Sequence, residues 1–255
     1  MTQDLSDAKG LRVLIVGASS GIGRAVAVDA ARRGAKVAVA ARRIELLDEL
    51  AEEIGGVAFE LDVEQTAAIN RVVPAAVEAL GGLDAVVFTS TVVPFAHIED
   101  TEFATWVHAF SINTIGASNV LRAAREHLAE DGVVLIASSQ MVGRPRAGVA
   151  AYDASKAALD EVLRSWRNEH PDLAVIRVGI GPTEDTEILR GADRELLTEL
   201  FDRWTTNGQL PRKMSELDDV AATLFSLVSM AHANPSVVPE SVQLTPRIPR
   251  ALLDD

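Results

Sequence analysis

The amino-acid sequence predicts an α/β protein with a doubly wound, mostly parallel β-sheet and helices on both faces, a three-layer α/β/α arrangement. Short β-branched apolar runs recur along the chain, and the first three are each followed by an alanine-rich helical pattern. Near-continuous apolar strands are typical of parallel sheets that helices cover on both sides. The alternation therefore predicts βαβ units.

The predicted elements follow these runs in order. The expected strands are residues 11–16, 36–40, 57–61, 84–89, 132–138, 173–179 and 241–245. The expected helices are residues 22–33, 45–54, 65–80, 101–129 and 149–170. Pro74 falls inside the third helical pattern, so that helix is expected to kink or to be shorter.

The domain organisation is expected to be simple. No internal repeat, low-complexity tract or linker divides the sequence, so residues 1–255 are expected to form a single domain. Residues 183–210 mix acidic and apolar side chains after a strand, which predicts a helical flap over a site.

Composition excludes several classes of function. The chain has no cysteine, which rules out disulfides and thiolate metal sites, and its five histidines show no metal-ligand spacing. A net charge of -13 argues against binding to nucleic acid or anionic membranes. The polar, acidic first ten residues do not resemble a signal peptide, and no apolar run is long enough to span a membrane. We therefore expect a cytoplasmic protein without a metal.

A glycine-rich turn follows the first predicted strand. Gly17, Gly21 and Gly23 lie in VGASSGIGRAVA, between that strand and the first helix. Such a turn lets backbone approach a ligand closely, and the helix N-terminus offers free N–H groups to an anion. The position at the first βα turn of a parallel sheet favours the pyrophosphate of a dinucleotide over glycines placed for packing alone.

The same turn allows a second interpretation. Residues 17–21 also match G-x-S-x-G, the nucleophile elbow of α/β-hydrolases, with Ser19 as the nucleophile. The match comes earlier in the chain than a hydrolase requires, and neither His170 nor His232 lies in a recognisable catalytic loop. A hydrolase is thus a remote alternative.

The end of the second predicted strand indicates which dinucleotide is bound. An acidic residue there would bind the ribose of NAD, whereas an arginine would pair with the 2′-phosphate of NADP. The sequence reads Arg42 and Arg43, with no acidic residue before Glu45. NADP is therefore favoured over NAD, with Arg42 as the expected contact, although two arginines could also simply solvate a helix start.

The only tyrosine of the chain lies in a predicted helix. Tyr152 and Lys156 are one turn apart and would share a face. A phenol can give a proton to the alkoxide that forms when hydride reduces a ketone, and it can remove that proton in the reverse reaction. A nearby ammonium is expected to lower the phenol's pKa. Taken alone, such a pair is usually a surface pair.

Together these motifs resemble the classical short-chain dehydrogenase/reductase family from about residue 10 to 228. The family pattern T-G-x-x-x-G-x-G appears with Val16 in place of the threonine, and Y-x-x-x-K is Tyr152 and Lys156. The resemblance implies that Asn113 and Ser139 complete the catalytic group. The family spacing between serine and tyrosine selects Ser139 over its neighbour Ser138.

The resemblance implies a Rossmann-type fold and a dinucleotide site. The residues expected to contact the cofactor are Gly17, Ser19, Ser20, Gly21, Ile22, Gly23, Arg42, Arg43, Asp62, Val63, Thr89, Tyr152, Lys156 and Thr186. Two segments depart from the family pattern. Residues 88–91 read FTST in place of N-N-A-G, and residues 181–186 read GPTEDT in place of P-G-x-V-x-T.

The expected function is an NADP-dependent oxidoreductase that acts on a carbonyl or secondary alcohol, with Tyr152 as general acid/base. The alternative is a dinucleotide-binding sensor or scaffold of the same fold that is catalytically weak or inactive, because the two departures lie beside the expected site. By analogy with the family, the helices at 101–129 and 149–170 are expected to pair in a homodimer or homotetramer.

Overall fold

The computed structural model describes residues 8–247. All seven predicted strands are present. They are β1 (Arg12–Val16), β2 (Lys36–Ala41), β3 (Val57–Glu60), β4 (Leu83–Phe88), β5 (Leu128–Ser139), β6 (Ala174–Ile180) and β7 (Ser241–Leu244). Strand β5 begins at Leu128 rather than at residue 132, because Leu128 pairs with Leu83 of β4 before a register shift.

The strands form one sheet in the order β3-β2-β1-β4-β5-β6-β7, and every neighbouring pair is parallel. The chain builds β1 to β3 toward one edge and then returns to β1 to build β4 to β7 toward the other. This doubly wound order confirms the predicted fold class. It also leaves a crevice at the carboxyl ends of β1 and β4, where such folds bind ligands.

The helices connect these strands. They are α1 (Gly21–Arg32), α2 (Ile44–Ile54), α3 (Thr66–Leu80), α4 (Phe103–Phe110), α5 (Ala117–Arg125), α6 (Ala150–Glu169), α7 (Arg194–Thr206) and α8 (Leu217–Ala233). Helix α3 continues through Pro74 to Leu80. Helix α8 is not among the helices predicted from the sequence.

The helix predicted at residues 101–129 differs from the prediction. A π-helical turn, η2 (Ser111–Gly116), separates α4 from α5, and the helix ends at Arg125 because β5 begins at Leu128. The π turn contains the predicted catalytic residue Asn113. Such turns insert one extra residue into a helix and often occur at functional sites.

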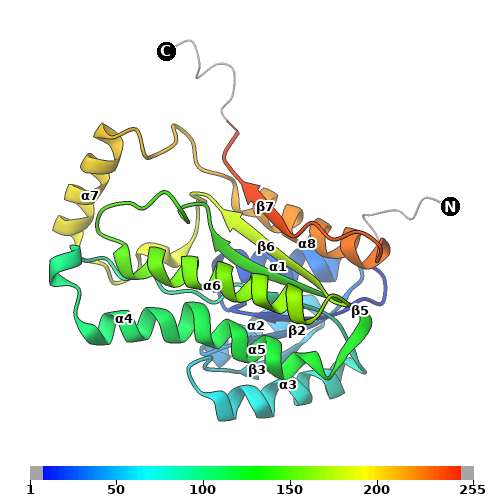
Figure 1. The fold of residues 1–255 in the computed structure, drawn as a ribbon. Coiled ribbons are helices and arrows are strands. Elements are labelled where there is room, and N and C mark those ends of the chain that lie inside the picture. The colour runs from blue at the N-terminus through cyan, green and yellow to red at the C-terminus, as the bar shows by residue number, and fades with distance from the viewer. Residues whose placement is uncertain (1–7, 248–255) are drawn as a thin grey trace.

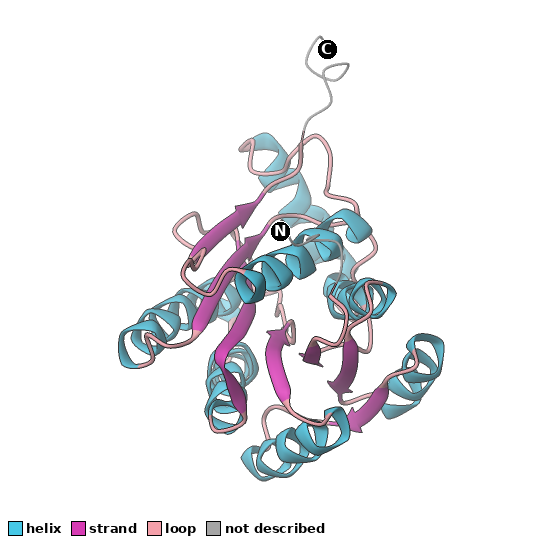
Figure 2. Ribbon diagram, turned by 90° about the vertical axis from the view of Figure 1, so that its right-hand side faces the viewer, coloured by secondary structure: helices cyan, strands magenta, loops and turns pink. Residues whose placement is uncertain are grey.

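Two apolar layers flank the sheet, as its alternating side chains require. Val13 and Ile15 of β1 pack with α1, α2 and α8. Leu14 and Val16, which point to the other face, pack with α3, α5 and α6. Figure 1 shows α5 and α6 in front of the sheet and α1 behind it, and Figure 2 shows helices along both sides of the twisted strands. The near-continuous apolar runs thus reflect burial on both faces.

The region predicted as a helical flap contains a short 3₁₀ helix, η3 (Glu187–Leu189), and α7. Asp193 caps α7, since its side chain accepts a hydrogen bond from the backbone N–H of Leu196 at 2.9 Å. Trp204 anchors the helix, because its indole N–H donates to the carbonyl of Ala147 at 3.0 Å. Leu200 and Trp204 pack in a small apolar cluster with Val149 and Tyr152. None of the described helices is both long and apolar enough to cross a membrane.

Candidate active site

The glycine turn joins β1 to α1, and packing explains two of its three glycines. A Cβ atom on Gly17 would lie 2.5 Å from the backbone nitrogen of Ser90, and one on Gly23 would lie 2.3 Å from the carbonyl oxygen of Gly17. Gly21 is different. Its φ of +50° favours glycine, but the nearest neighbour of a Cβ there would be Thr186 at 3.8 Å.

The N-terminus of α1 is available to an anion. Ser20 occupies the N-cap position, and among the described residues its side chain makes no capping hydrogen bond to the helix. The first N–H groups of a helix need an acceptor and favour negative charge. An uncapped helix start beside Gly21 and a neighbouring arginine fits the diphosphate of a nicotinamide dinucleotide.

That arginine is Arg43, which reaches across from the end of β2. Its guanidinium donates to the Ser19 hydroxyl at 3.2 and 3.1 Å and to the Ser20 hydroxyl at 2.6 Å. It also forms an ion pair of 2.8 Å with Glu187 of η3. Arg42 is exposed. The structure therefore turns Arg43, rather than the expected Arg42, toward the glycine turn.

These contacts do not support the hydrolase interpretation. The partner that the structure gives to the Ser19 hydroxyl is Arg43, and no described hydrogen bond joins Ser19 to a histidine. His170 instead accepts from Arg125 and packs against Trp166. No group of three or more acidic or histidine side chains is arranged for a metal within the part of the chain that the structure describes.

The other residues expected at the cofactor lie around the same crevice. Asp62 follows β3, and its carboxylate accepts from the backbone of Glu64 at 3.1 Å. Val63 is buried against Gly116 of the π turn. Thr89 follows β4 and donates to the carbonyl of Val16 at 3.0 Å, which joins the ends of β4 and β1. Ile22 is half-buried at the start of α1 and packs against the core behind the sheet.

Asn113 ties the loop after β4 to helix α6. Its side-chain oxygen accepts from the Val92 backbone N–H at 2.9 Å and from the Thr91 hydroxyl at 3.0 Å. Its amide donates to the Val92 carbonyl and to the Ser155 hydroxyl, both at 2.9 Å, and Ser155 in turn donates to the Tyr152 carbonyl at 2.7 Å. Asn113 thus contacts the backbone that carries Tyr152 through one intermediary.

Tyr152 lies at the first turn of α6, beside the end of β5. It is 8% exposed, and the Ser139 side chain interacts with its phenol. Burial is the main influence on this group and raises its pKa to about 12; the Ser139 interaction lowers it, and the nearby Asp153 carboxylate raises it. The expectation that a neighbouring ammonium lowers the phenol's pKa is therefore wrong for this arrangement.

Lys156 is directed toward the sheet. Its ammonium is 2% exposed and donates to the carbonyl of Ala137 on β5 at 2.9 Å. Burial lowers the pKa of Lys156 to about 8, while the carboxylate of Asp160 raises it. The lysine is thus held next to the sheet, one helical turn from the phenol.

The structure separates the two candidate serines. The hydroxyl of Ser138 donates to Asp160 at 2.6 Å, whereas that of Ser139 accepts from the Met141 backbone N–H at 3.0 Å and lies by Tyr152. Adjacent strand residues face opposite ways, as expected. Among the described side chains, the structure thus brings Ser139, Tyr152 and Lys156 together, with Asn113 behind them.

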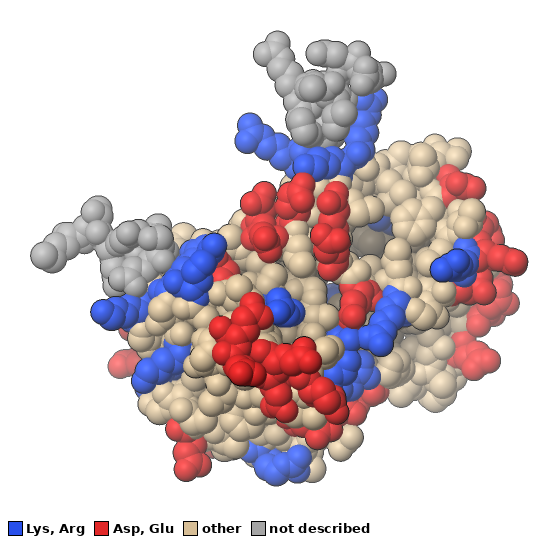
Figure 3. Space-filling model, turned by 180° about the vertical axis from the view of Figure 1, so that it is seen from behind, with Lys and Arg blue, Asp and Glu red and all other residues tan. Residues whose placement is uncertain are grey.

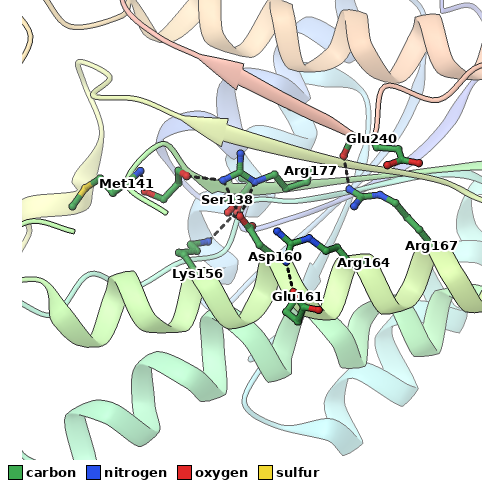
Figure 4. A network of polar contacts seen from close by, with 11 residues as sticks. Ser138, Met141, Lys156, Asp160, Glu161, Arg164, Arg167, Arg177 and Glu240 are labelled. Atoms are coloured by element: carbon green, nitrogen blue, oxygen red, sulfur yellow. Dashed lines mark hydrogen bonds and ion pairs between the residues drawn. The ribbon is translucent and has the colours of Figure 1, made fainter. Parts of the chain in front are cut away.

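Sequence reasoning missed several charged neighbours of this group. Asp160 and Arg177 form a buried ion pair beside Lys156, shown in Figure 4. Two signals could have revealed it. Asp160 follows Lys156 at the same one-turn spacing by which Lys156 follows Tyr152, and Arg177 interrupts an apolar strand.

Comparison with known proteins agrees with the geometry. A family model described as short chain dehydrogenase matches residues 12–196. A probable tetrahydroxynaphthalene reductase from Zymoseptoria tritici is 35% identical over 188 residues, which cover 70% of each chain. A versicolorin reductase from Emericella nidulans is 35% identical over 194 residues, which cover 72% of this chain and 73% of that protein.

A solved structure extends the comparison to the whole fold. A short chain dehydrogenase from Burkholderia cenocepacia J2315, in complex with NADP, is 26% identical and superposes with a TM-score of 0.79, covering 92% of this chain and 96% of that one. The family match spans more than half of the sequence and includes every strand from β1 to β6. The chain therefore belongs to the short-chain dehydrogenase/reductase family of oxidoreductases.

Proposed function

We propose that the protein is an NADP(H)-dependent oxidoreductase that transfers hydride between the nicotinamide and a carbonyl or secondary alcohol substrate. One observation carries this proposal. A buried phenol, a serine hydroxyl and a buried lysine meet at the carboxyl end of β5, on the same edge of the sheet as the uncapped start of α1.

Three groups of residues would hold the cofactor. The start of α1 at Gly21 would bind the diphosphate, and Arg43 would pair with a 2′-phosphate. By family resemblance, Lys156 and Thr186 would contact the nicotinamide half. When bound, the cofactor supplies or accepts the hydride. Support for NADP comes from Arg43 and from the NADP complex of the Burkholderia relative.

The proton is the chain's own contribution to the reaction. With a pKa of about 12, the Tyr152 phenol is protonated at neutral pH, which suits it to donate a proton to the substrate oxygen during reduction. Ser139 would donate a hydrogen bond to the same oxygen and stabilise its developing charge. Because the phenol is buried, water does not compete for this proton.

The substrate is expected to have an apolar body. Half-buried apolar side chains pack against Tyr152 and Trp204, namely Val93, Phe95, Met141, Leu196, Phe201 and Leu210. They come from the loop after β4, the loop after β5 and the flap. Their convergence on the phenol supports the flap's role as a cover for the substrate.

Assembly and location remain predictions. Exposed apolar residues on and before α4, among them Phe103 at 83% exposure, support pairing with a second copy of the chain. We propose a homodimer or homotetramer that uses this face. The cytoplasmic location rests on the sequence alone.

The replacement Tyr152→Phe tests the proposal. It removes the proton donor and keeps the ring, so turnover of any carbonyl substrate is expected to fall by about 10²–10⁴-fold. The affinity for NADPH, measured by its fluorescence on titration, is expected to stay nearly the same. A variant with undiminished turnover contradicts the proposed mechanism.

A second candidate, a dinucleotide-binding sensor or scaffold, is favoured by one feature. Arg43, which would pair with the 2′-phosphate, is already paired with Glu187. A sensor would use the exchange of these partners as its signal. Incubation with NADPH and a panel of ketones separates the two candidates, since a sensor binds NADPH and turns over none of them.

A further inference from the structure

The proposed reaction gives no function to a buried ion pair beside Lys156. Asp160 of α6 and Arg177 of β6 form an ion pair of 2.9 Å, and their side chains are 9% and 7% exposed. The carboxylate is fully engaged. Its Oδ1 accepts from the Ser138 hydroxyl at 2.6 Å and its Oδ2 accepts from the Arg177 Nε at 2.9 Å.

Stability alone does not account for this pair. Taking two charges out of water costs more than their attraction usually returns, and an apolar pair of the same volume is often as stable. The pair lies between α6 and β6, among other polar groups that include Ser138, the Ser139 carbonyl and Lys156. A charged pair in this place therefore indicates a role in positioning or in electrostatics.

The pair is joined directly to the catalytic group. A second nitrogen of Arg177, Nη2, donates to the backbone carbonyl of Ser139 at 2.8 Å. The next residue, Gln140, donates its backbone N–H to the Ile180 carbonyl at 3.1 Å. These two bonds fix the end of β5 against β6 at the point where the Ser139 hydroxyl meets the phenol. Figure 4 shows Arg177 between Asp160 and this strand end.

The pair also sets the charge beside Lys156. Asp160 lies one helical turn beyond Lys156 on the same face of α6, and Tyr152 lies one turn before it. From β6, Arg177 faces the same place. The π turn that packs on α6 contributes Asn113 and Thr114, which are uncharged, and β5 contributes the Ala137 carbonyl. The Asp160 carboxylate raises the pKa of Lys156, and Arg177 lowers it by a smaller influence.

We propose that Asp160 and Arg177 are positioning residues of the active site, where Arg177 holds the strand end that carries Ser139 and Asp160 keeps Lys156 in its ammonium form. The effect on turnover rests on the proposed function, whereas the effect on Lys156 does not. The two effects can therefore be tested separately.

Lys156 can be observed without cofactor or substrate. The chain has four lysines, so protein labelled with ¹³C at the lysine Cε gives few NMR signals to assign and titrate. The replacement Asp160→Asn is expected to move the Lys156 titration to lower pH by about one unit, because it removes the stabilising charge and leaves Arg177 unbalanced. Asp160→Glu, which keeps the charge, is expected to restore it toward the wild-type value.

A double variant, Asp160→Asn with Arg177→Met, removes both charges. Its Lys156 titration is expected to lie below that of the wild type, because Asp160 has the larger influence of the two, and above that of Asp160→Asn. The comparison with the wild type tests the proposal even if Asp160→Asn alone does not fold. Glu161→Gln, at an exposed position on the same helix, is the control and is expected to leave the titration unchanged.

Kinetics test the other half of the proposal. Arg177→Lys keeps the charge but loses the forked guanidinium that reaches the Ser139 carbonyl, so kcat is expected to fall about tenfold while NADPH binding and the Lys156 titration stay the same.

Identical Lys156 titrations in the wild type and in the folded Asp160 and double variants overturn the electrostatic role. An unchanged kcat in Arg177→Lys overturns the positioning role. If the titrations shift as expected but no ketone is reduced, the proposed function fails and the electrostatic role stands.

Discussion

At the scale of single residues, Asp153 lies in an unfavourable environment beside the phenol. It directly follows Tyr152, and its Oδ2 accepts from the Arg146 backbone N–H at 3.1 Å. Its Oδ1 is buried without a hydrogen-bond partner among the described residues. Burial raises its pKa to about 6. The carboxylate therefore destabilises the native state above that pH, and this penalty disappears below about pH 4, where both folded and unfolded chains are protonated.

The replacement Asp153→Asn tests this sign. It keeps an acceptor for the Arg146 backbone and removes the charge, so the free energy of unfolding is expected to rise by about 1–3 kcal/mol at pH 7.5 and not at all near pH 4. Denaturant unfolding at both pH values measures the difference. Asp131→Asn, at an exposed position of β5, is the control. Equal gains at the two pH values contradict the assignment.

The sequence was sufficient to select the catalytic candidates, because their spacing is a local property. The one-turn separation of Tyr152 and Lys156 is visible in the sequence, and the structure brings both to the end of β5. The pKa of the phenol was not predictable. It depends on burial beside Leu200 and Trp204, which belong to a helix distant in sequence, and on the Ser139 side chain.

At the scale of elements, the loop between β5 and α6 packs closely against α7 at Gly148. Gly148 has a φ of +78°, and a Cβ there would lie 2.3 Å from a methyl carbon of Leu200. Gly143 in the same loop has a φ of +80° with no atom within 4 Å of its Cβ position. The two glycines share the backbone cost of substitution and differ only in the contact with α7.

This pair of glycines gives a matched test of how α7 is held. Gly148→Ala is expected to lower the free energy of unfolding by about 1–3 kcal/mol more than Gly143→Ala, because only the former displaces the buried Leu200 side chain of α7. Denaturant unfolding measures both. A Gly148→Ala variant that unfolds like Gly143→Ala shows that α7 adjusts without cost.

The ion pair between Arg43 and Glu187 connects η3 to the glycine turn. A 2′-phosphate would compete with Glu187 for Arg43, so Glu187→Gln is expected to tighten NADPH binding about two- to fivefold, the range of a partly exposed ion pair. NADH, which has no 2′-phosphate, is expected to gain less. Fluorescence titrations with both nucleotides measure this, with Glu195→Gln on α7 as the control. An equal gain for both nucleotides contradicts the assignment.

Strands were easier to predict than helix irregularities. The seven apolar runs marked the strands because burial on both faces leaves little room for polar residues. The π turn within the helix at 103–125 was not visible, since the bonds of Asn113 and Thr114 to other elements accompany it and these partners are distant in sequence. The start of β5 at Leu128 was missed for another reason, because the apolar run is interrupted by the exposed acids Glu130 and Asp131.

At the scale of the whole molecule, the surface combines a strong negative charge with one apolar face. Acidic side chains are spread over the face seen in Figure 3, with basic ones between them, as the net charge of -13 leads one to expect. Ile98, Phe103 and Val107 are 65%, 83% and 47% exposed. Phe103 and Val107 lie one helical turn apart on α4, so their side chains form a continuous apolar surface.

This surface is where we expect a second copy of the chain to bind. The double replacement Phe103→Asp with Val107→Asp adds four charges across a twofold interface and is expected to convert the oligomer into a smaller species. Light scattering after size-exclusion chromatography measures the mass. Val237→Asp, at a position that is 63% exposed before β7, is the control. An unchanged mass in the double variant places the interface elsewhere.

The order of the strands has a consequence for biosynthesis. Strand β2 pairs with β1, β3 with β2, β4 with the free side of β1, and each later strand with the one before it. Every strand after β1 therefore finds a partner already made when it leaves the ribosome, and none of them has to be inserted between two strands that are already paired. The sheet can therefore grow outward from β1 while translation continues. At each stage only the outermost strand on either side has unpaired backbone groups.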